Sequence, residues 1–223
     1  MSDHNVQRLR RLDACAVSDA LDKLQLPGVV TGLTQRSGGG RIAGRAVTMK
    51  VGPGQPPPGL ARHLGCTAIE QSGADNVIVV EQRSGMEAGC WGGLLTLGAK
   101  VRGVAGVVAD GPLRDVDEAM AYEFPVFSRS LTSRTARGRV VELGVQVPVT
   151  IGAAQGGEVT VMPGDYVLAD RSAVIFIATA DIDRVLDAAE MIVAKEAAMA
   201  KAILAGTPIG EVMGGNYEHM LNT

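Results

Sequence analysis

Residues 76–130 read NVIVVEQRSGMEAGCWGGLLTLGAKVRGVAGVVADGPLRDVDEAMAYEFPVFSRS, and this stretch decides the fold. Three short apolar strands alternate in it with two helical segments: strands at 76–82, 104–110 and 124–130, helices at 90–103 and 113–123. Apolar runs separated by helices of this length are typical of β–α–β units, in which neighbouring strands run parallel. The stretch therefore predicts an α/β fold with a largely parallel central sheet.

The residues before this stretch predict a helical start. Residues 7–24 carry apolar side chains at helical spacing, with a break near Cys15. After the break we expect Ser18 or Asp19 to cap a second helical segment. Three further segments follow: a strand at 41–51, a proline-rich exposed loop at 51–59 and a helix at 60–72.

The residues after this stretch follow a different pattern. Residues 139–179 form shorter apolar runs separated by the turns MPGD and ADRS, which is typical of antiparallel or mixed β structure. The last long helix covers 181–206, with Asp181 as its expected cap and Gly206 at its end. We expect one domain over residues 1–223, in which a central, partly parallel sheet carries an additional β layer.

Composition excludes several classes of protein. Of 223 residues, 46% are hydrophobic and 20% are charged, which are the values of a globular chain. A net charge of −3 gives no basic surface for nucleic acid or an anionic membrane. The N-terminus has no apolar signal core, and no run reaches the ~18 apolar residues of a membrane helix. Three cysteines without CxxC spacing indicate neither a disulfide framework nor a zinc site. We expect a cytoplasmic protein.

The residues best suited to chemistry lie between Gly89 and Asp117. The strand VAGVVAD ends at Asp110, a Gly-Pro pair is expected to turn the chain, and Arg114 and Asp115 follow at the next helix start. In open α/β folds, ligands bind beyond the carboxyl ends of the strands. There, an arginine offers a cation for a substrate carboxylate, and an aspartate offers an anion for a metal.

The segment WGGLL, residues 91–95, adds the start of a helix to this region. Its backbone N–H groups and the helix dipole favour an anion. An oxygen-rich site with few nitrogen ligands suits Mg²⁺ or Mn²⁺ better than zinc. A purely structural interpretation also stands: a turn, a helix cap, a surface ion pair and a glycine pair that permits close packing.

The other nucleophilic or metal-binding residue types give weaker signals. His4, His63 and His219 are scattered without i, i+4 spacing, which favours surface or packing roles. Cys90 stands beside the glycine pair without a neighbouring histidine, so nucleophilic catalysis is not indicated. Lys100 is the one lysine near the motif and follows the helix start, which disfavours a Schiff-base aldolase.

The motif DGPLRD, preceded by AKVRGVAGVVA and GGLL, resembles the signature of the RraA-like proteins. That family includes class II 4-hydroxy-4-methyl-2-oxoglutarate/4-carboxy-4-hydroxy-2-oxoadipate aldolases and the regulator of ribonuclease E activity. The similarity extends over CAVSDAL, FPVFSRS, MPGD, ADRSAVIFI and the AKEAA helix. It implies a β/β/α swivelling-domain-like fold, assembled as a homotrimer or a dimer of trimers with active sites between subunits.

The resemblance also implies roles for single residues. Arg114 would bind the 2-oxo acid and Asp115 the divalent metal, Mg²⁺ or Mn²⁺. The GGLL turn would hold the pyruvyl carboxylate; its residues are Gly92, Gly93, Leu94 and Leu95.

Two acidic residues complete the expected catalytic set, one of them a choice between two glutamates, and one position departs from the family pattern. Glu196 or Glu190, on the C-terminal helix of a neighbouring subunit, would approach the site. Gly93 stands where the aldolases commonly carry an acidic residue that helps hold metal-bound waters. Asp110 is expected to compensate in part, although its place at a strand end also fits a structural role.

The reaction implied is retro-aldol cleavage of a 4-hydroxy-2-oxo acid, which releases pyruvate. Two alternatives remain open at the level of sequence. Decarboxylation of oxaloacetate uses the same electron sink and needs no base at C4, so it tolerates Gly93 better. A non-catalytic ribonuclease-regulating binder is the third interpretation, and the presence of both Arg114 and Asp115 argues against it.

Overall fold

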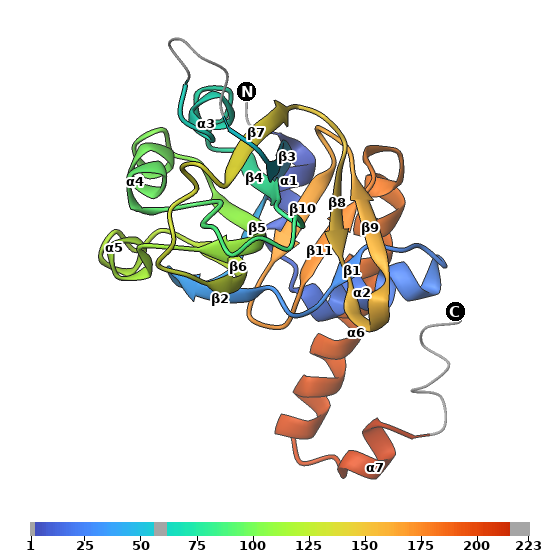
Figure 1. Ribbon diagram of the computed structural model, residues 1–223. Helices are drawn as coiled ribbons and strands as arrows, with labels where there is room; N and C mark the ends of the chain where they lie inside the picture. The colour runs from blue at the N-terminus through green and yellow to red at the C-terminus, as the bar shows by residue number, and fades with distance from the viewer. Residues whose placement is uncertain (1–2, 56–61, 215–223) are drawn as a thin grey trace.

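The computed structural model describes residues 3–55 and 62–214 (Figure 1). Part of the predicted loop 51–59 and His219 lie outside the described residues. Over the described ranges, no helix combines the length and the apolar character that crossing a bilayer requires.

Two short helices open the fold, α1 (His4–Leu9) and α2 (Ala14–Lys23). The side chain of Asp13 caps α2 by accepting the N–H of Ala16 over 2.9 Å. The expected cap at Ser18 or Asp19 is wrong, because both residues lie inside α2 and the break falls before Cys15.

One large sheet organises the described part of the chain. Its strands run in the order β1-β11-β10-β3-β4-β5-β6-β2, with β7 added against β3. The three pairings β3/β4, β4/β5 and β5/β6 are parallel, and the other pairings are antiparallel. The α/β fold with a partly parallel sheet is therefore confirmed. The strand bounds are β1 Val29–Val30, β2 Thr34–Ser37, β3 Ile42–Pro53, β4 Asn76–Glu81, β5 Gly106–Leu113, β6 Val126–Leu131, β7 Val140–Val145, β10 Tyr166–Ala169 and β11 Val174–Ile177.

Helices and a second sheet cover the two faces of this sheet (Figure 1). On one face, α3 (Cys66–Glu70), α4 (Gly93–Val101) and α5 (Val116–Ala121) pack on β3 to β6. The helices α1 and α2 and the long helix α6 (Ile182–Leu204) pack together against β10 and β11. On the opposite face lies a two-stranded sheet of β8 (Val149–Gly152) and β9 (Glu158–Val161). This hairpin is the expected additional β layer.

The carboxyl end of β5 differs from the sequence prediction. Gly111 and Pro112 do not turn the chain; β5 continues through them to Leu113. The strand tolerates the proline because its pairing with β6 shifts register between Ala109 and Pro112, and such irregularities are where sheets accommodate proline. Asp110 therefore lies within the strand instead of at its end.

The helix predicted at 60–72 is also shorter than expected. Within the described residues α3 covers only Cys66–Glu70. Gly65, at its N-cap, has a φ of 84°, and this left-handed backbone ends the helix on its N-terminal side. His63 consequently lies outside the helix, in the turn that leads into it.

The C-terminal helix leaves the body of the molecule (Figure 1). None of the described residues of α6 after Ile192 is buried, and α7 (Ile209–Val212) follows without buried residues. Asp181 occupies the N-cap position of α6 as expected, but its carboxylate accepts Arg184 Nε over 3.0 Å and makes no bond to the helix backbone.

Candidate functional site

The candidate site lies at the start of α4, beside the carboxyl end of β5. Trp91 forms an isolated parallel bridge with Leu113 at the end of β5. The buried indole Nε1 of Trp91 donates to Thr96 Oγ1 over 3.1 Å, and this hydroxyl donates to the carbonyl of Gly92 over 2.9 Å. These bonds fix the first residue of α4 against the end of β5.

Asp115 joins the starts of two helices. Its backbone is left-handed, with a φ of 58°, a conformation that costs an ordinary residue about 1 kcal/mol. The carboxylate makes no capping bond to α5; its Oδ2 accepts the N–H of Gly93 over 3.0 Å and lies 3.1 Å from Arg114 Nε. Asp115 therefore occupies the N-cap position of α5, as the structural interpretation expected, but its carboxylate binds the first N–H of α4 instead of the backbone of α5.

Glycines make room for the Arg114–Asp115 pair. A Cβ on Gly89 would lie 2.9 Å from Arg114 Cγ. A Cβ on Gly92 would lie 2.9 Å from Asp115 Oδ2 and 3.1 Å from Arg114 Cγ. The arginine stem therefore lies directly on this glycine backbone, which holds the guanidinium at the start of α4.

Gly93 makes room for a second carboxylate, that of Glu118. A Cβ on Gly93 would lie 1.8 Å from Glu118 Oε2 and 3.2 Å from Asp115 Cβ. The Glu118 carboxylate thus occupies the space that a side chain at position 93 would fill. Two carboxylates, from Asp115 and Glu118, lie against the same backbone segment.

These elements line a pocket of about 200 Å³. This size suits a small organic acid, since drug-sized ligands occupy larger pockets. The pocket brings together every residue predicted for substrate and metal binding. Its lining is His63, Leu64, Gly89, Cys90, Trp91, Gly92, Gly93, Leu94, Leu95, Arg114, Asp115, Thr135 and Ala136.

The start of α4 provides anion-binding donors at this pocket. The first N–H groups of an α-helix have no acceptor within the helix. The N–H of Gly93 is taken by Asp115, so the N–H groups of Leu94 and Leu95 are those that a ligand carboxylate can use. The Leu94 side chain is 83% exposed, which leaves this end of the helix accessible.

The donor set at the pocket fits a divalent cation of the Mg²⁺ type. Its ligands from the chain would be the carboxylate oxygens of Asp115, which lines the pocket, and of Glu118, which lies beside Gly93 outside the lining. Oxygen is the ligand that Mg²⁺ and Mn²⁺ prefer. The described residues contain no group of three or more histidine, cysteine, aspartate or glutamate side chains placed to hold a metal. Mg²⁺ usually keeps several waters and is held by one or two carboxylates.

Asp110 lies outside this pocket. It shares a face of β5 with Val108, which packs towards the β8–β9 hairpin, because side chains alternate along a strand. Its Oδ1 accepts Arg129 Nε over 2.8 Å, and its Oδ2 accepts the N–H of Gly152 over 2.6 Å. These contacts tie β5 to the end of β8; the catalytic role expected for Asp110 remains a prediction.

The two glutamates expected from the C-terminal helix have different surroundings. Glu190 accepts Arg8 Nε and Nη2, each over 2.8 Å, within the same chain. Glu196 is exposed on the part of α6 that leaves the body. None of the described residues that line the pocket belongs to α6, so a role for Glu196 needs a second copy and remains a prediction.

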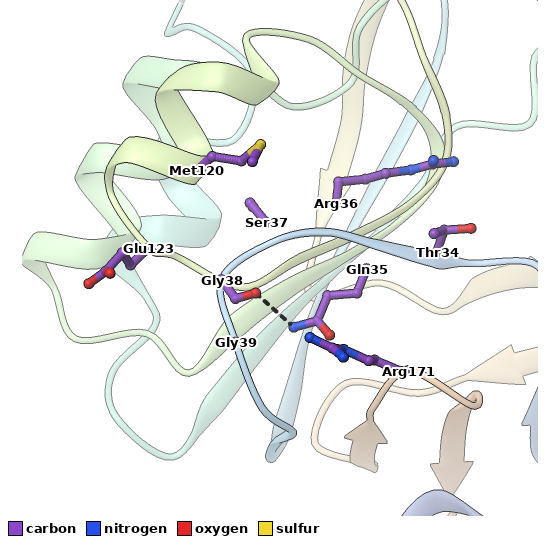
Figure 2. A pocket seen from close by; sticks show the side chains of 9 residues that line it. All are labelled: Thr34, Gln35, Arg36, Ser37, Gly38, Gly39, Met120, Glu123 and Arg171. Atoms are coloured by element: carbon purple, nitrogen blue, oxygen red, sulfur yellow. Dashed lines mark hydrogen bonds between the residues drawn. The ribbon is translucent and has the colours of Figure 1, made fainter.

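Two other features do not form part of the site. Complete burial raises the pKa of the Cys90 thiol to about 12, which agrees with its rejection as a nucleophile. A larger cavity of about 810 Å³ lies beside β2 and contains none of the predicted site residues (Figure 2). In this cavity the side chain of Gln35 donates to the carbonyl of Gly38 over 3.3 Å, and Arg36 Nε donates to Ser128 Oγ over 3.2 Å.

Sequence reasoning missed two residues of the site, Glu118 and His63. Glu118 lies in the first turn of α5, three residues after Asp115, and this closeness in sequence was a usable signal. His63 lines the pocket although the sequence favoured a surface or packing role. No signal pointed to it, because residues 60–72 were predicted as one helix, whereas His63 lies before the start of α3.

Comparison with known proteins supports a common family. A family model described as RraA-like, Aldolase/RraA, matches residues 14–176. A protein of Halalkalibacterium halodurans, named "Putative 4-hydroxy-4-methyl-2-oxoglutarate aldolase", is 28% identical over 89% of this chain and 88% of its own. The chain spans 32% and 58% of the lengths of two other curated relatives.

Solved structures share the fold. The crystal structure of an uncharacterized protein from Pseudomonas syringae pv. tomato superposes with a TM-score of 0.81 at 27% identity, covering 95% of this chain and 93% of that one. Streptomyces coelicolor RraAS2, described as an unusual member of the RNase ES inhibitor RraA family, superposes with a TM-score of 0.71 at 24% identity, covering 85% and 91%.

Proposed function

This chain belongs to the RraA-like family, and on that premise we propose that it is a divalent-metal-dependent carbon–carbon lyase. Its reaction is the retro-aldol cleavage of a 4-hydroxy-2-oxo acid, which yields pyruvate. The observation that carries the proposal is the joint position of Arg114, Asp115 and the start of α4 in one pocket of about 200 Å³.

The pocket residues bind the keto-acid end of the substrate. The N–H groups of Leu94 and Leu95 hold the carboxylate at the positive end of the α4 dipole. Arg114 Nε faces Asp115, so the terminal Nη groups of the guanidinium point to the 2-oxo oxygen as charge develops there. Asp115 and Glu118 would hold a divalent cation, which would supply Lewis-acid stabilisation of the negative charge that develops on the substrate.

These interactions favour the transition state over the bound substrate. When the C3–C4 bond breaks, its electron pair forms the enolate of pyruvate, and the oxygen on C2 gains negative charge. Donors that are already in place stabilise this charge without reorganisation. Arg114 therefore contributes more to turnover than to substrate binding.

The test is an assay of pyruvate release. The protein is incubated with 4-hydroxy-2-oxo acids, with and without Mg²⁺ or EDTA, and pyruvate is coupled to lactate dehydrogenase. We expect metal-dependent release that falls by about 100-fold in Arg114→Ala, since removing one such donor costs about 10²–10³ in turnover. Arg171→Ala, at an exposed arginine outside the pocket, is the matched control. Absence of metal-dependent pyruvate from any substrate would instead favour a binding protein, with ribonuclease E as the next partner to test.

Decarboxylation of oxaloacetate is the second candidate. It forms the same enolate but needs no base at C4, and Gly93 contributes no side chain to the pocket. The same assay with oxaloacetate measures it, and the ratio of the two activities ranks the candidates.

We also propose that the protein forms a homotrimer or a dimer of trimers. This assembly would allow Glu196 of one copy to approach the pocket of another, which it does not line in its own chain. Light scattering coupled to size exclusion tests the assembly, and a monomer that retains full lyase activity would contradict it.

A further inference from the structure

The segment before α3, residues 62–65, holds a histidine at the pocket. His63 lines the cavity together with Arg114 and Asp115. The N–H of Gly65 donates to Glu142 Oε2 over 2.8 Å, and the neighbouring Leu64 is 8% exposed. The N–H of Cys66 donates to the His63 carbonyl over 3.3 Å. These hydrogen bonds hold the backbone on both sides of Leu64. The His63 side chain is exposed, so a ligand can reach it.

A hydrogen bond sets the tautomer of this imidazole. His63 Nδ1 lies 2.8 Å from the carbonyl oxygen of Leu64. A carbonyl oxygen only accepts hydrogen bonds, so Nδ1 carries the hydrogen. In the neutral ring, Nε2 is then the nitrogen with the free lone pair, and it is the proton acceptor of the side chain.

We propose that His63 is the general base of the retro-aldol reaction, an inference that rests on the lyase function proposed above. Nε2 accepts the proton of the substrate 4-hydroxyl, and C4 and its oxygen become the carbonyl of the departing product. The C3–C4 bond breaks, and its electron pair forms the C2–C3 double bond of the pyruvate enolate. C3 then takes a proton from water, and the imidazolium returns its proton to water.

The other titratable side chains of the pocket are unsuited to this step. Among the described lining residues they are Cys90, Arg114 and Asp115. A guanidinium stays protonated and cannot act as a base. Burial raises the pKa of the Cys90 thiol to about 12, and Asp115 is already committed to the Gly93 N–H and to Arg114. His63 has no such commitment at Nε2 among the hydrogen bonds of the described residues, and histidine is the usual base near neutral pH.

The experiment compares two reactions of the same variant, His63→Gln. We expect kcat for aldol cleavage to fall by about 100-fold or more, because general-base catalysis contributes about 10²–10⁴. Decarboxylation of oxaloacetate needs no base at C4, so its kcat is expected to fall by less than about threefold. The matched control is His4→Gln, at an exposed histidine on α1 away from the pocket. Imidazole added to His63→Ala is expected to restore part of the aldol activity.

The outcomes separate this inference from the proposed function. An equal fall in both reactions, or no fall in aldol cleavage, would overturn His63 as the base while leaving the lyase function standing. A wild-type protein that releases pyruvate from neither substrate would remove the proposed function and this inference together. Thermal melting of each variant confirms that a loss of turnover does not come from unfolding.

Discussion

Replacing Gly93 by alanine is expected to remove one carboxylate from the site without harming the fold. The added Cβ would lie 1.8 Å from Glu118 Oε2, whereas non-bonded contacts settle near 3.5 Å. The carboxylate must therefore retreat by about 1.7 Å, and it can do so because it ends a flexible side chain. Gly93 is the first residue of α4, so alanine gains less there than the about 0.5–1 kcal/mol that it gains over glycine in a helix interior. Stability should stay the same or rise.

The functional cost follows from the loss of a cation ligand or of its hydrogen-bonding support. Losing such a carboxylate typically lowers metal affinity or activity by about 10- to 100-fold. Isothermal titration calorimetry with Mn²⁺ measures the affinity, and pyruvate release at varied Mg²⁺ measures the activity. Gly98→Ala, on the same helix, is the matched control, because a Cβ there meets Ile69 Cδ1 at an ordinary 3.6 Å.

A double variant tests whether Gly93→Ala acts by displacing Glu118. If Gly93→Ala acts by displacing Glu118, then combining it with Glu118→Gln should cost no more than either change alone, since both remove the same interaction. Additive losses would show that Gly93 acts by another route. Parent-like metal affinity and turnover in Gly93→Ala would refute the assignment of Glu118 to the site.

Three further predictions concern the parts around the site. Asp110→Ala should lower the free energy of unfolding by about 2–3 kcal/mol, because it leaves Arg129 without its buried partner. Urea denaturation measures this change, and a value below about 0.5 kcal/mol would contradict the prediction. Iodoacetamide at pH 8 should modify exposed Cys15 and leave Cys90 unmodified until the protein unfolds, as mass spectrometry would show. The hydrogen bond from Arg8 lowers the pKa of Glu190, so its stabilisation is present above the ordinary carboxyl pKa and is lost as pH falls through the lowered value. Glu190→Gln should therefore cost about 0.5 kcal/mol at neutral pH and progressively less as the pH falls below the ordinary carboxyl pKa, measured by denaturation over that pH range.

The sequence predicted the parts of the fold that depend on local patterns. The apolar run of β4 lies close to its predicted position, because burial on both faces leaves an unbroken apolar stretch in the sequence. β6 and the glycine-led helix α4 also lie close to their predicted positions. The pairing of β7 against the end of β3 was not predicted. Strand pairs distant in sequence leave no periodic signal, so their order had to come from the structure.

The residues near Pro112 show why local rules failed at the edge of the site. A Gly-Pro pair normally marks a turn, and the prediction placed Asp110 at the end of its strand for that reason. In the structure a register shift against β6 carries the proline within β5, and the strand reaches Leu113. Asp110 then lies on the face opposite to α4, and alternation along the strand separates it from Asp115.

The roles of Gly93 and Glu118 in the site can be interpreted only when the two positions are considered together. Taken alone, a glycine at the start of α4 indicates a missing carboxylate, and a glutamate one turn into α5 indicates a solvated helix face. The distance of 1.8 Å between a Cβ on Gly93 and Glu118 Oε2 means that the two positions compete for one volume. The site can therefore take its second carboxylate from position 93 or from position 118, but not from both in this backbone. Gly93→Asp in the Glu118→Ala background should then recover metal affinity, whereas Gly93→Asp with Glu118 present should gain nothing over the parent.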